Sequence, residues 1–317
     1  MDRTDDHGRT VQRRIFLHTP LPSALRIQAL AARYKFYEND HMFYNDKYPT
    51  FLVSHEYFGR IMWSVAAGRS GAIDLGAGYG SLRDSYFMDN RLESYQNGRV
   101  RSKSRLWQAL LRYTTSTLDE YSFPRSGRSI AATAMAVAGR NSTGLTEGIL
   151  DVTHPSWLQL EMAGRFYPSL SNKFTLGVEA DVMLSTRKLL PTYSASISAA
   201  PAWYPTPSSN NALHPSFRSN SFIGAGLVPV WKINSNLSAR VGGYAFIPIR
   251  RLEEAADGSA FYGKWISRPS WFAEAALGYH FPFGTLAGYV NYCDGPGGRW
   301  NVGISFGVFV LPPRFLR

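Results

Sequence analysis

The last part of the chain alternates strictly between bulky apolar residues and small or polar ones. One face of this run consists of Trp300, Val302, Ile304, Phe306, Val308 and Val310, and the other consists of Asn301, Gly303, Ser305 and Gly307. A period of two predicts a β-strand. Because the bulky face is uninterrupted and the opposite face is small or polar, the pattern is typical of a barrel strand that turns its apolar side to lipid.

The segment before this run repeats the arrangement. Trp271, Ala273, Ala275, Leu277, Tyr279 and Phe281 share one face, against Glu274, Gly278 and His280 on the other. Pro282–Gly284 is too short for a crossover helix, so the strands on either side of it are predicted to be antiparallel. The next connection, Asp294–Gly298, is rich in glycine and proline and predicts a second hairpin.

Similar alternation predicts strands through most of the remaining chain. They cover residues 25–36, 58–66, 73–80, 105–116, 129–138, 157–167, 173–184, 193–199, 222–231 and 237–249. The alanine-rich segment 129–138 could be helical on propensity, but Gly127 and Gly139 at its ends favour a strand. Charged residues at every second place near Glu179 predict a hydrated interior. The fold class expected is all-β: an antiparallel transmembrane β-barrel with about twelve or thirteen strands.

This pattern divides the chain into three parts. Residues 1–24 are expected to be disordered or the remnant of a loop, residues 25–311 to form a partial outer-membrane barrel, and residues 312–317 to form a tail. Met1–Arg9 has neither the apolar core nor the cleavage site of a secretory signal. A protein of the outer membrane needs such a signal, so we expect the chain to be the downstream part of a longer precursor.

Composition agrees with a barrel rather than a bundle of membrane helices. Hydrophobic residues make up 44% of the 317 residues and aromatic residues 14%, but the mean hydropathy is only −0.21. No stretch approaches the roughly 18 continuous apolar residues expected of a transmembrane helix. Any crossing of a membrane must therefore be made by strands.

The formal net charge of +11 arises from 34 Lys and Arg against 23 Asp and Glu. We expect the excess basic residues in loops and in the lumen, facing anionic lipid head groups. Nucleic-acid binding is not predicted, because the basic residues are scattered and no recognition motif accompanies them. The single cysteine, Cys293, excludes an internal disulfide, and the seven histidines lack paired spacing, so no metal or other cofactor is predicted.

Two motifs suggest catalysis or phosphate binding but lack the required context. Gly303–Gly307 fits the Gly-x-Ser-x-Gly pattern, which in serine hydrolases lies on a sharp strand-to-helix turn. Here Ser305 and both glycines share one side of an alternating strand, so a catalytic role is not expected. Gly76–Gly80 lacks the strand-then-helix setting of a dinucleotide loop. A self-contained soluble esterase that uses Ser305 remains an alternative, which ester turnover with and without Ser305→Ala would test.

Charged residues on the polar faces are expected to form a structural network across the barrel interior rather than a transport path. The candidates are Glu161, Arg165, Glu179, Asp181, Arg240 and Glu274.

Several stretches carry a resemblance to a known family. Thr117–Gly127 resembles the "N-T-L…P-x-x-G" strand connection of the BamA-like outer-membrane barrel superfamily, also called bacterial surface antigens. Ala200–Thr206, Ser216–Gly226 and Tyr244–Pro248 resemble more narrowly the barrel of patatin-like phospholipases of Gram-negative bacteria. The closing Val290–Tyr292 and Ile304–Gly307 agree, and the resemblance covers roughly residues 25–310.

The resemblance implies a larger parent protein with a signal, a patatin hydrolase domain with a Ser-Asp dyad, a small linker domain and a sixteen-stranded barrel. This chain matches only the later barrel strands, so no catalytic residue carries over, and the chain itself is not expected to be an enzyme. Its implied role is to anchor or secrete a hydrolase domain. The alternative is a barrel of the same superfamily that assembles or translocates other proteins.

The implied partners are outer-membrane lipid, the barrel assembly machinery and an upstream patatin domain. Arg218 matches the arginine of the superfamily's inward-folded lid loop, which implies pairing with Glu179 or Asp181. Ser219 replaces the glycine of that motif. Because a partial barrel exposes unpaired backbone at its first strand, we expect that this chain does not insert alone as a closed cylinder.

Overall fold

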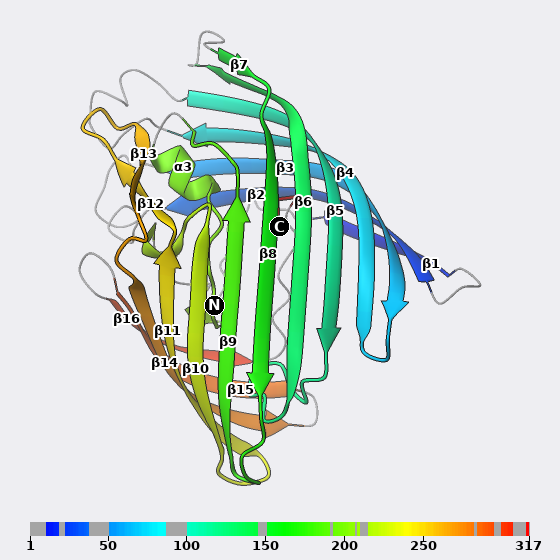
Figure 1. Ribbon diagram of the computed structural model, residues 1–317, viewed down its shortest axis with the longest axis vertical. Helices are drawn as coiled ribbons and strands as arrows, with labels where there is room; N and C mark the ends of the chain where they lie inside the picture. The colour runs from blue at the N-terminus through cyan, green and yellow to red at the C-terminus, as the bar shows by residue number, and fades with distance from the viewer. Residues whose placement is uncertain are drawn as a thin grey trace.

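The computed structural model describes residues 11–18, 23–37, 51–86, 100–144, 151–190, 193–206, 208–209, 215–281, 284–294, 299–306 and 315–316. Almost all of these residues lie in antiparallel β-strands, which curl around a common interior (Figure 1). The all-β barrel fold expected from the sequence is confirmed.

One 14-stranded sheet contains the spanning strands, and neighbours along the chain are neighbours in the sheet. They are β1 (Val11–His18), β2 (Ser23–Tyr37), β3 (Phe51–Ala67), β4 (Gly71–Tyr86), β5 (Val100–Ser116), β6 (Gly127–Gly144), β8 (Ser156–Tyr167), β9 (Phe174–Ser185), β10 (Phe222–Lys232), β11 (Leu237–Pro248), β14 (Ser270–Phe281), β15 (Gly284–Cys293) and β16 (Arg299–Phe306). The short β7 (Asp151–Thr153) pairs with β6 away from this path. Between β11 and β14 a separate hairpin is formed by β12 (Arg250–Glu254) and β13 (Ala260–Trp265).

Two segments differ from the predicted strands. Residues 193–199 form a helix, α3 (Tyr193–Ala199), because three successive residues, Ala195, Ser196 and Ile197, are buried and no free face remains for a period of two. Residues Val11–His18, predicted as part of an unstructured leader, form β1, which pairs with β2 along its whole length. Residues 307–310, predicted to continue the last strand, lie outside the described residues.

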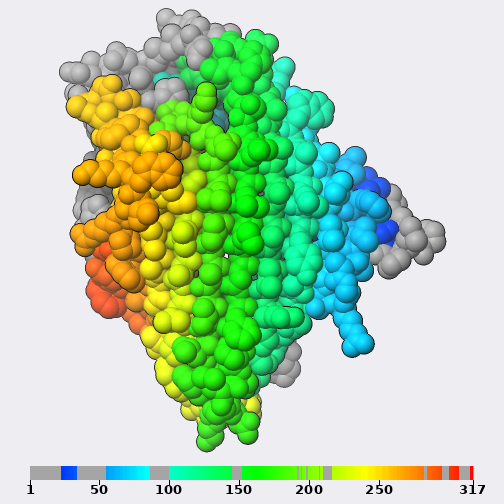
Figure 2. All heavy atoms as spheres, in the orientation of Figure 1, coloured from blue at the N-terminus to red at the C-terminus, as the bar shows by residue number. Residues whose placement is uncertain are grey.

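The outer face of the sheet is apolar and exposed. Side chains on it alternate with buried ones along each strand, as in β14, where Trp271 and Leu277 are exposed and Phe272 and Glu274 are buried. The exposed positions include Ile61, Trp63, Leu75, Trp107, Leu111, Leu158, Leu227, Val241, Trp271 and Leu277. Figure 2 shows one side of this wall, across the middle strands. Large apolar side chains in continuous exposed rows are the lipid-facing surface of a membrane barrel.

The two ends of the barrel differ in the length of their connections. One end has the short connections 68–70, 168–173 and 233–236, whereas the other has 38–50, 87–99 and 186–221. In Figure 1 the turns 168–173 and 233–236 lie at the bottom, and α3 with the β12–β13 hairpin lies at the top. Outer-membrane barrels have short periplasmic turns and longer extracellular loops, so the end that carries α3 is the extracellular one. No helix among the described residues is long and apolar enough to cross a membrane.

The interior contains apolar side chains as well as the charged ones from which a hydrated lumen was predicted. Two apolar clusters fill it, one against β2–β6 and one against β9–β14. In the second cluster Trp203 and Phe217, from the long connection between β9 and β10, pack on Phe246 with ring centroids 6.1 and 5.7 Å apart. Alternation along a strand identifies which face is inside, but it does not reveal that a distant loop covers that face.

The first cluster contains a segment that follows β16 in the chain. Phe315 is fully buried against Phe58, with ring centroids 5.5 Å apart. Its carbonyl oxygen accepts hydrogen bonds from Arg60 Nη2 at 2.8 Å and from Gln108 Nε2 at 2.7 Å. Residues 315–316, expected to be part of a tail, therefore lie on the inner wall of the barrel.

Within the described residues the sheet does not close on itself. β1 pairs only with β2, and β16 pairs only with β15.

Candidate functional site

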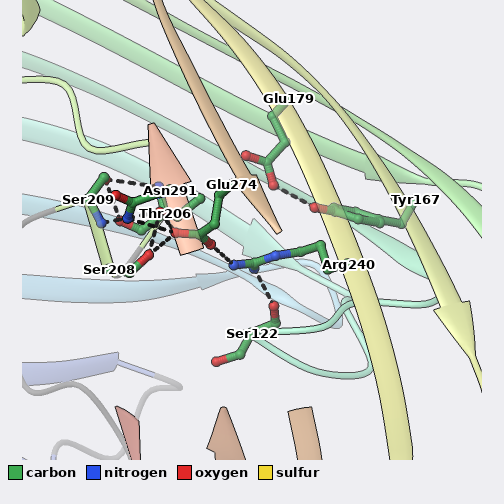
Figure 3. A network of polar contacts seen from close by, with 9 residues as sticks. All are labelled: Ser122, Tyr167, Glu179, Thr206, Ser208, Ser209, Arg240, Glu274 and Asn291. Atoms are coloured by element: carbon green, nitrogen blue, oxygen red, sulfur yellow. Dashed lines mark hydrogen bonds and ion pairs between the residues drawn. The ribbon is translucent and has the colours of Figure 1, made fainter. Parts of the chain in front are cut away.

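The most buried ion pair among the described residues lies in the middle of the lumen. Arg240 on β11 and Glu274 on β14 both point inward, and their side chains are 10% and 1% exposed. The two strands are neighbours, with Gly242 opposite Glu274, so Arg240 lies one inward position away and reaches it diagonally. Arg240 Nη2 and Glu274 Oε1 are 2.5 Å apart (Figure 3).

The second oxygen of Glu274 binds the long extracellular connection. Thr206 Oγ1 donates a hydrogen bond to Glu274 Oε2 at 2.9 Å, and Ser208 Oγ donates to the same oxygen. Asn291 on β15 adds a longer contact of 3.4 Å from its Nδ2. These hydrogen bonds satisfy polar atoms that burial removes from water. Thr206 and Ser208 are thereby attached to the central ion pair of the lumen.

The other side of Arg240 binds the connection between β5 and β6 at the periplasmic end. Arg240 Nη1 donates to the Ser122 carbonyl oxygen at 2.5 Å, and its guanidinium lies 5.2 Å from the centre of the Phe123 ring. Phe123 is 1% exposed, and its ring occupies the space beside Gly278. The Arg240–Glu274 pair therefore joins two inward-folded loops that enter from opposite ends of the barrel.

The same periplasmic connection has two further attachments. Glu120 lies 3.2 Å from His280 Nδ1, and the Arg125 carbonyl oxygen accepts a hydrogen bond from Thr175 Oγ1 at 2.7 Å. Burial raises the pKa of the Glu120 carboxyl, and the adjacent His280 opposes this shift. The connection 117–126 thus lies against β9, β11 and β14 inside the barrel mouth.

A second polar group surrounds Glu179 on β9. Tyr167 Oη donates to Glu179 Oε1 at 2.5 Å, and Arg165 Nε lies 3.8 Å from the same oxygen. Arg218 donates to the Ala200 carbonyl oxygen at 3.2 Å and to Tyr204 Oη at 3.4 Å, both within its own loop. The pairing of Arg218 with Glu179 or Asp181 stays a prediction.

The structure brings only part of the predicted network together. Arg240 with Glu274 and Arg165 with Glu179 form pairs. Glu161 forms no side-chain hydrogen bond or ion pair within the part of the chain that the structure describes. Sequence reasoning missed Ser122, Thr206 and Ser208, which lie in connections without periodicity. For two of them the sequence did offer an indication, because Ser122 and Thr206 fall in the stretches that carry the family resemblance.

Ser305 lies on a regular strand rather than on a nucleophile turn. It is paired with Ala287 in the β15–β16 ladder and faces a small cavity of about 30 Å³ beside Arg240 and Glu274. A cavity of this size has room for about one water molecule. No group of His, Cys, Asp and Glu among the described residues has the arrangement of a metal site.

No protein-family model and no curated protein matches the sequence. Solved structures do match the fold. The crystal structure of BamA from Haemophilus ducreyi lacking POTRA domains 1–3 aligns with a TM-score of 0.53 and 13% identity, over 90% of this chain and 58% of that one. The ferric yersiniabactin uptake receptor FyuA from Yersinia pestis aligns with a TM-score of 0.45 and 7% identity, over 86% and 43% of the two chains. CdiB from Acinetobacter baumannii gives 0.38 and 11%, over 90% and 50%.

The chain thus spans little more than half the length of the BamA structure that it matches. At 13% identity this likeness concerns the fold alone. Together with the exposed apolar wall and the asymmetric ends, it identifies the chain as a bacterial outer-membrane β-barrel.

Proposed function

We propose that the chain is the membrane-embedded unit of an outer-membrane protein that assembles or translocates polypeptides. The observation that carries the proposal is the pair of strand edges at β1 and β16, which have no partner within the described residues. An unpaired edge is a template for another strand, which adds to it by main-chain hydrogen bonds. In lipid this pairing is strongly favoured, since unsatisfied backbone groups there cost several kcal/mol each.

The filled lumen supports a role other than passive diffusion. Loops from both ends meet at Arg240 and Glu274, and aromatic side chains occupy the remaining interior. A lumen occupied in this way by the described residues does not favour free diffusion of solutes through it. The BamA-like fold is compatible with this reading, although it carries no activity with it.

A photo-crosslinking amino acid at the β16 edge tests the proposal in cells. Val302 is 81% exposed on the outer side of β16, so a crosslinker there is expected to capture newly made outer-membrane polypeptides and to lose them as they mature. The matched control is Leu227 on β10. Its side chain also points outward, but its strand is paired with a neighbour on both sides. Crosslinks from Val302 to β1 alone, together with normal amounts of other barrels after deletion of the gene, would contradict the proposal.

The second candidate is the barrel of a patatin-like phospholipase that anchors or secretes its hydrolase domain. It is favoured by the sequence resemblance in Ala200–Thr206, Ser216–Gly226 and Tyr244–Pro248. These segments belong to the connection between β9 and β10 and to strands β10 and β11. The genomic sequence upstream of the Met1 codon would distinguish the two candidate functions. An in-frame Gly-x-Ser-x-Gly hydrolase supports the phospholipase, and repeated chaperone-like domains support the assembly barrel.

A further inference from the structure

A row of basic side chains crosses five neighbouring strands on the outer face of the barrel. Arg33 on β2 lies opposite His55 on β3, His55 lies opposite Arg83 on β4, and Arg83 lies opposite Lys103 on β5. Arg105 on β5 lies opposite Arg140 on β6. These six residues, called the basic row, alternate in sequence with inward-facing residues and are exposed or partly exposed.

The basic row adjoins the extracellular end of the apolar band. On β5 the outward residues run from Tyr113 through Leu111, Ala109 and Trp107 to Arg105, so the apolar band ends where the basic row begins. Trp107 and Tyr79, aromatic residues of this band beside the row, have ring centroids 4.7 Å apart. Aromatic residues of this kind mark the interface between hydrocarbon and head groups. The end in question carries the long loops and is therefore extracellular.

Among the described residues, no acidic side chain neutralises this charge. None of the six side chains forms an ion pair or a side-chain hydrogen bond with any residue that the structure describes, and no acidic residue shares their outward face on β2–β6. Like charges directly opposite each other across a ladder are destabilising. Opposed basic side chains of this kind offer a binding site for an anion.

The row is confined to one side of the barrel. At the same end, the outward residues on β8, β9, β10, β11, β14, β15 and β16 are Ser156, Leu184, Ile223, Ile247, Trp271, Tyr292 and Trp300. A general excess of basic residues at the extracellular rim would not produce this asymmetry.

We propose that the basic row binds the phosphate groups of an anionic lipid in the outer leaflet, whose acyl chains lie on the apolar strands below. Arginine suits this role because its planar guanidinium donates two parallel hydrogen bonds to one phosphate. The ligand is a lipid rather than a soluble phosphate, because the row adjoins exposed apolar surface on its membrane side.

Native mass spectrometry of the detergent-solubilised chain tests this with bis-phosphorylated lipid A as the probe. The same lipid without its phosphates, and inorganic phosphate, are the comparison ligands. The wild-type chain is expected to bind lipid A at least about tenfold more tightly than the dephosphorylated lipid, a ratio of the size that a few charge-assisted hydrogen bonds supply. Equal binding of the two lipids, or equally tight binding of inorganic phosphate, would overturn the proposal.

Paired variants locate the site. Arg105→Gln with Arg140→Gln is expected to remove most of the preference for phosphorylated lipid, and Arg105→Lys with Arg140→Lys to keep part of it. The control is Arg69→Gln with Arg128→Gln, which removes the same charge from exposed positions at the periplasmic end. Far-ultraviolet circular dichroism in the same detergent verifies that each variant keeps its β-structure. An equal loss in the control, or no loss in the Arg105 and Arg140 variant, would show that the row is not the site.

Discussion

Arg240 and Glu274 are separated by 34 positions in sequence, and their side chains form the central contact of the lumen. The energetic meaning of such a pair depends on burial. Removing one member of a buried pair leaves an uncompensated charge in a medium of low dielectric constant, which costs about 3–5 kcal/mol. An exposed pair is screened by water and contributes at most about 1 kcal/mol.

This contrast gives a prediction at the residue scale. Arg240→Ala is expected to lower the free energy of unfolding by about 3 kcal/mol or more, because Glu274 stays buried without its cation. The control is Arg125→Ala, whose partner Asp119 lies 3.4 Å away in a pair that is 41% and 29% exposed, and which is expected to cost less than about 1 kcal/mol. Urea unfolding in phospholipid vesicles measures both. Similar losses in the two variants would mean that the central pair is hydrated.

At the scale of elements, the connection between β9 and β10 folds into the barrel and packs against its inner wall. Its segments 201–203 and 217–219 pair with each other through the Trp203 amide and the Phe217 carbonyl. The strand beside them makes room for this fold. Gly224 faces inward under the Trp203 ring, where a Cβ atom would overlap the indole.

A glycine substitution tests whether the loop depends on that space. Gly224→Val is expected to displace Trp203 and to raise amide hydrogen exchange in residues 201–206 and 215–219, since these segments lose their contact with the wall. Gly243→Val is the matched control, because Gly243 faces outward and a Cβ atom there has no neighbour within 4 Å. Equal exchange in both variants would indicate that the loop is held by its polar contacts alone.

The sequence was informative where side chains alternate and uninformative where they do not. The strands around Trp107, Val178 and Leu277 were predictable because one face meets lipid and the other meets the interior, which forces a period of two. The same rule misassigned residues 193–199, since their alternation of serine with apolar residues is not the result of a two-faced environment. The contacts of Ser122, Thr206 and Ser208 could not be predicted, because they depend on where loops from opposite ends meet.

On the scale of the whole molecule, the outer wall decides between a membrane barrel and a soluble sheet. Leu227 is 57% exposed in the middle of β10. In water, a charged residue at such a position would change stability by less than about 0.5 kcal/mol. In a bilayer, arginine at the midplane on the lipid face costs about 2–4 kcal/mol.

Leu227→Arg is therefore expected to destabilise the barrel in vesicles by about 2–4 kcal/mol, because the guanidinium must enter hydrocarbon. Ser235→Arg, in the exposed turn between β10 and β11, is the control and is expected to have little effect. Unfolding by urea in vesicles gives both values. If Leu227→Arg is also neutral, the exposed apolar wall does not face lipid.

The sheet order has a consequence for how the barrel can close. Every step from one strand to the next reverses the chain, and the path from β1 to β16 contains an even number of reversals, so these two strands point the same way. A direct ladder between them would be parallel, with slanted hydrogen bonds that are slightly weaker per residue than those of the antiparallel ladders elsewhere. Such a ladder would need less free energy per residue to open than the antiparallel ladders of the sheet.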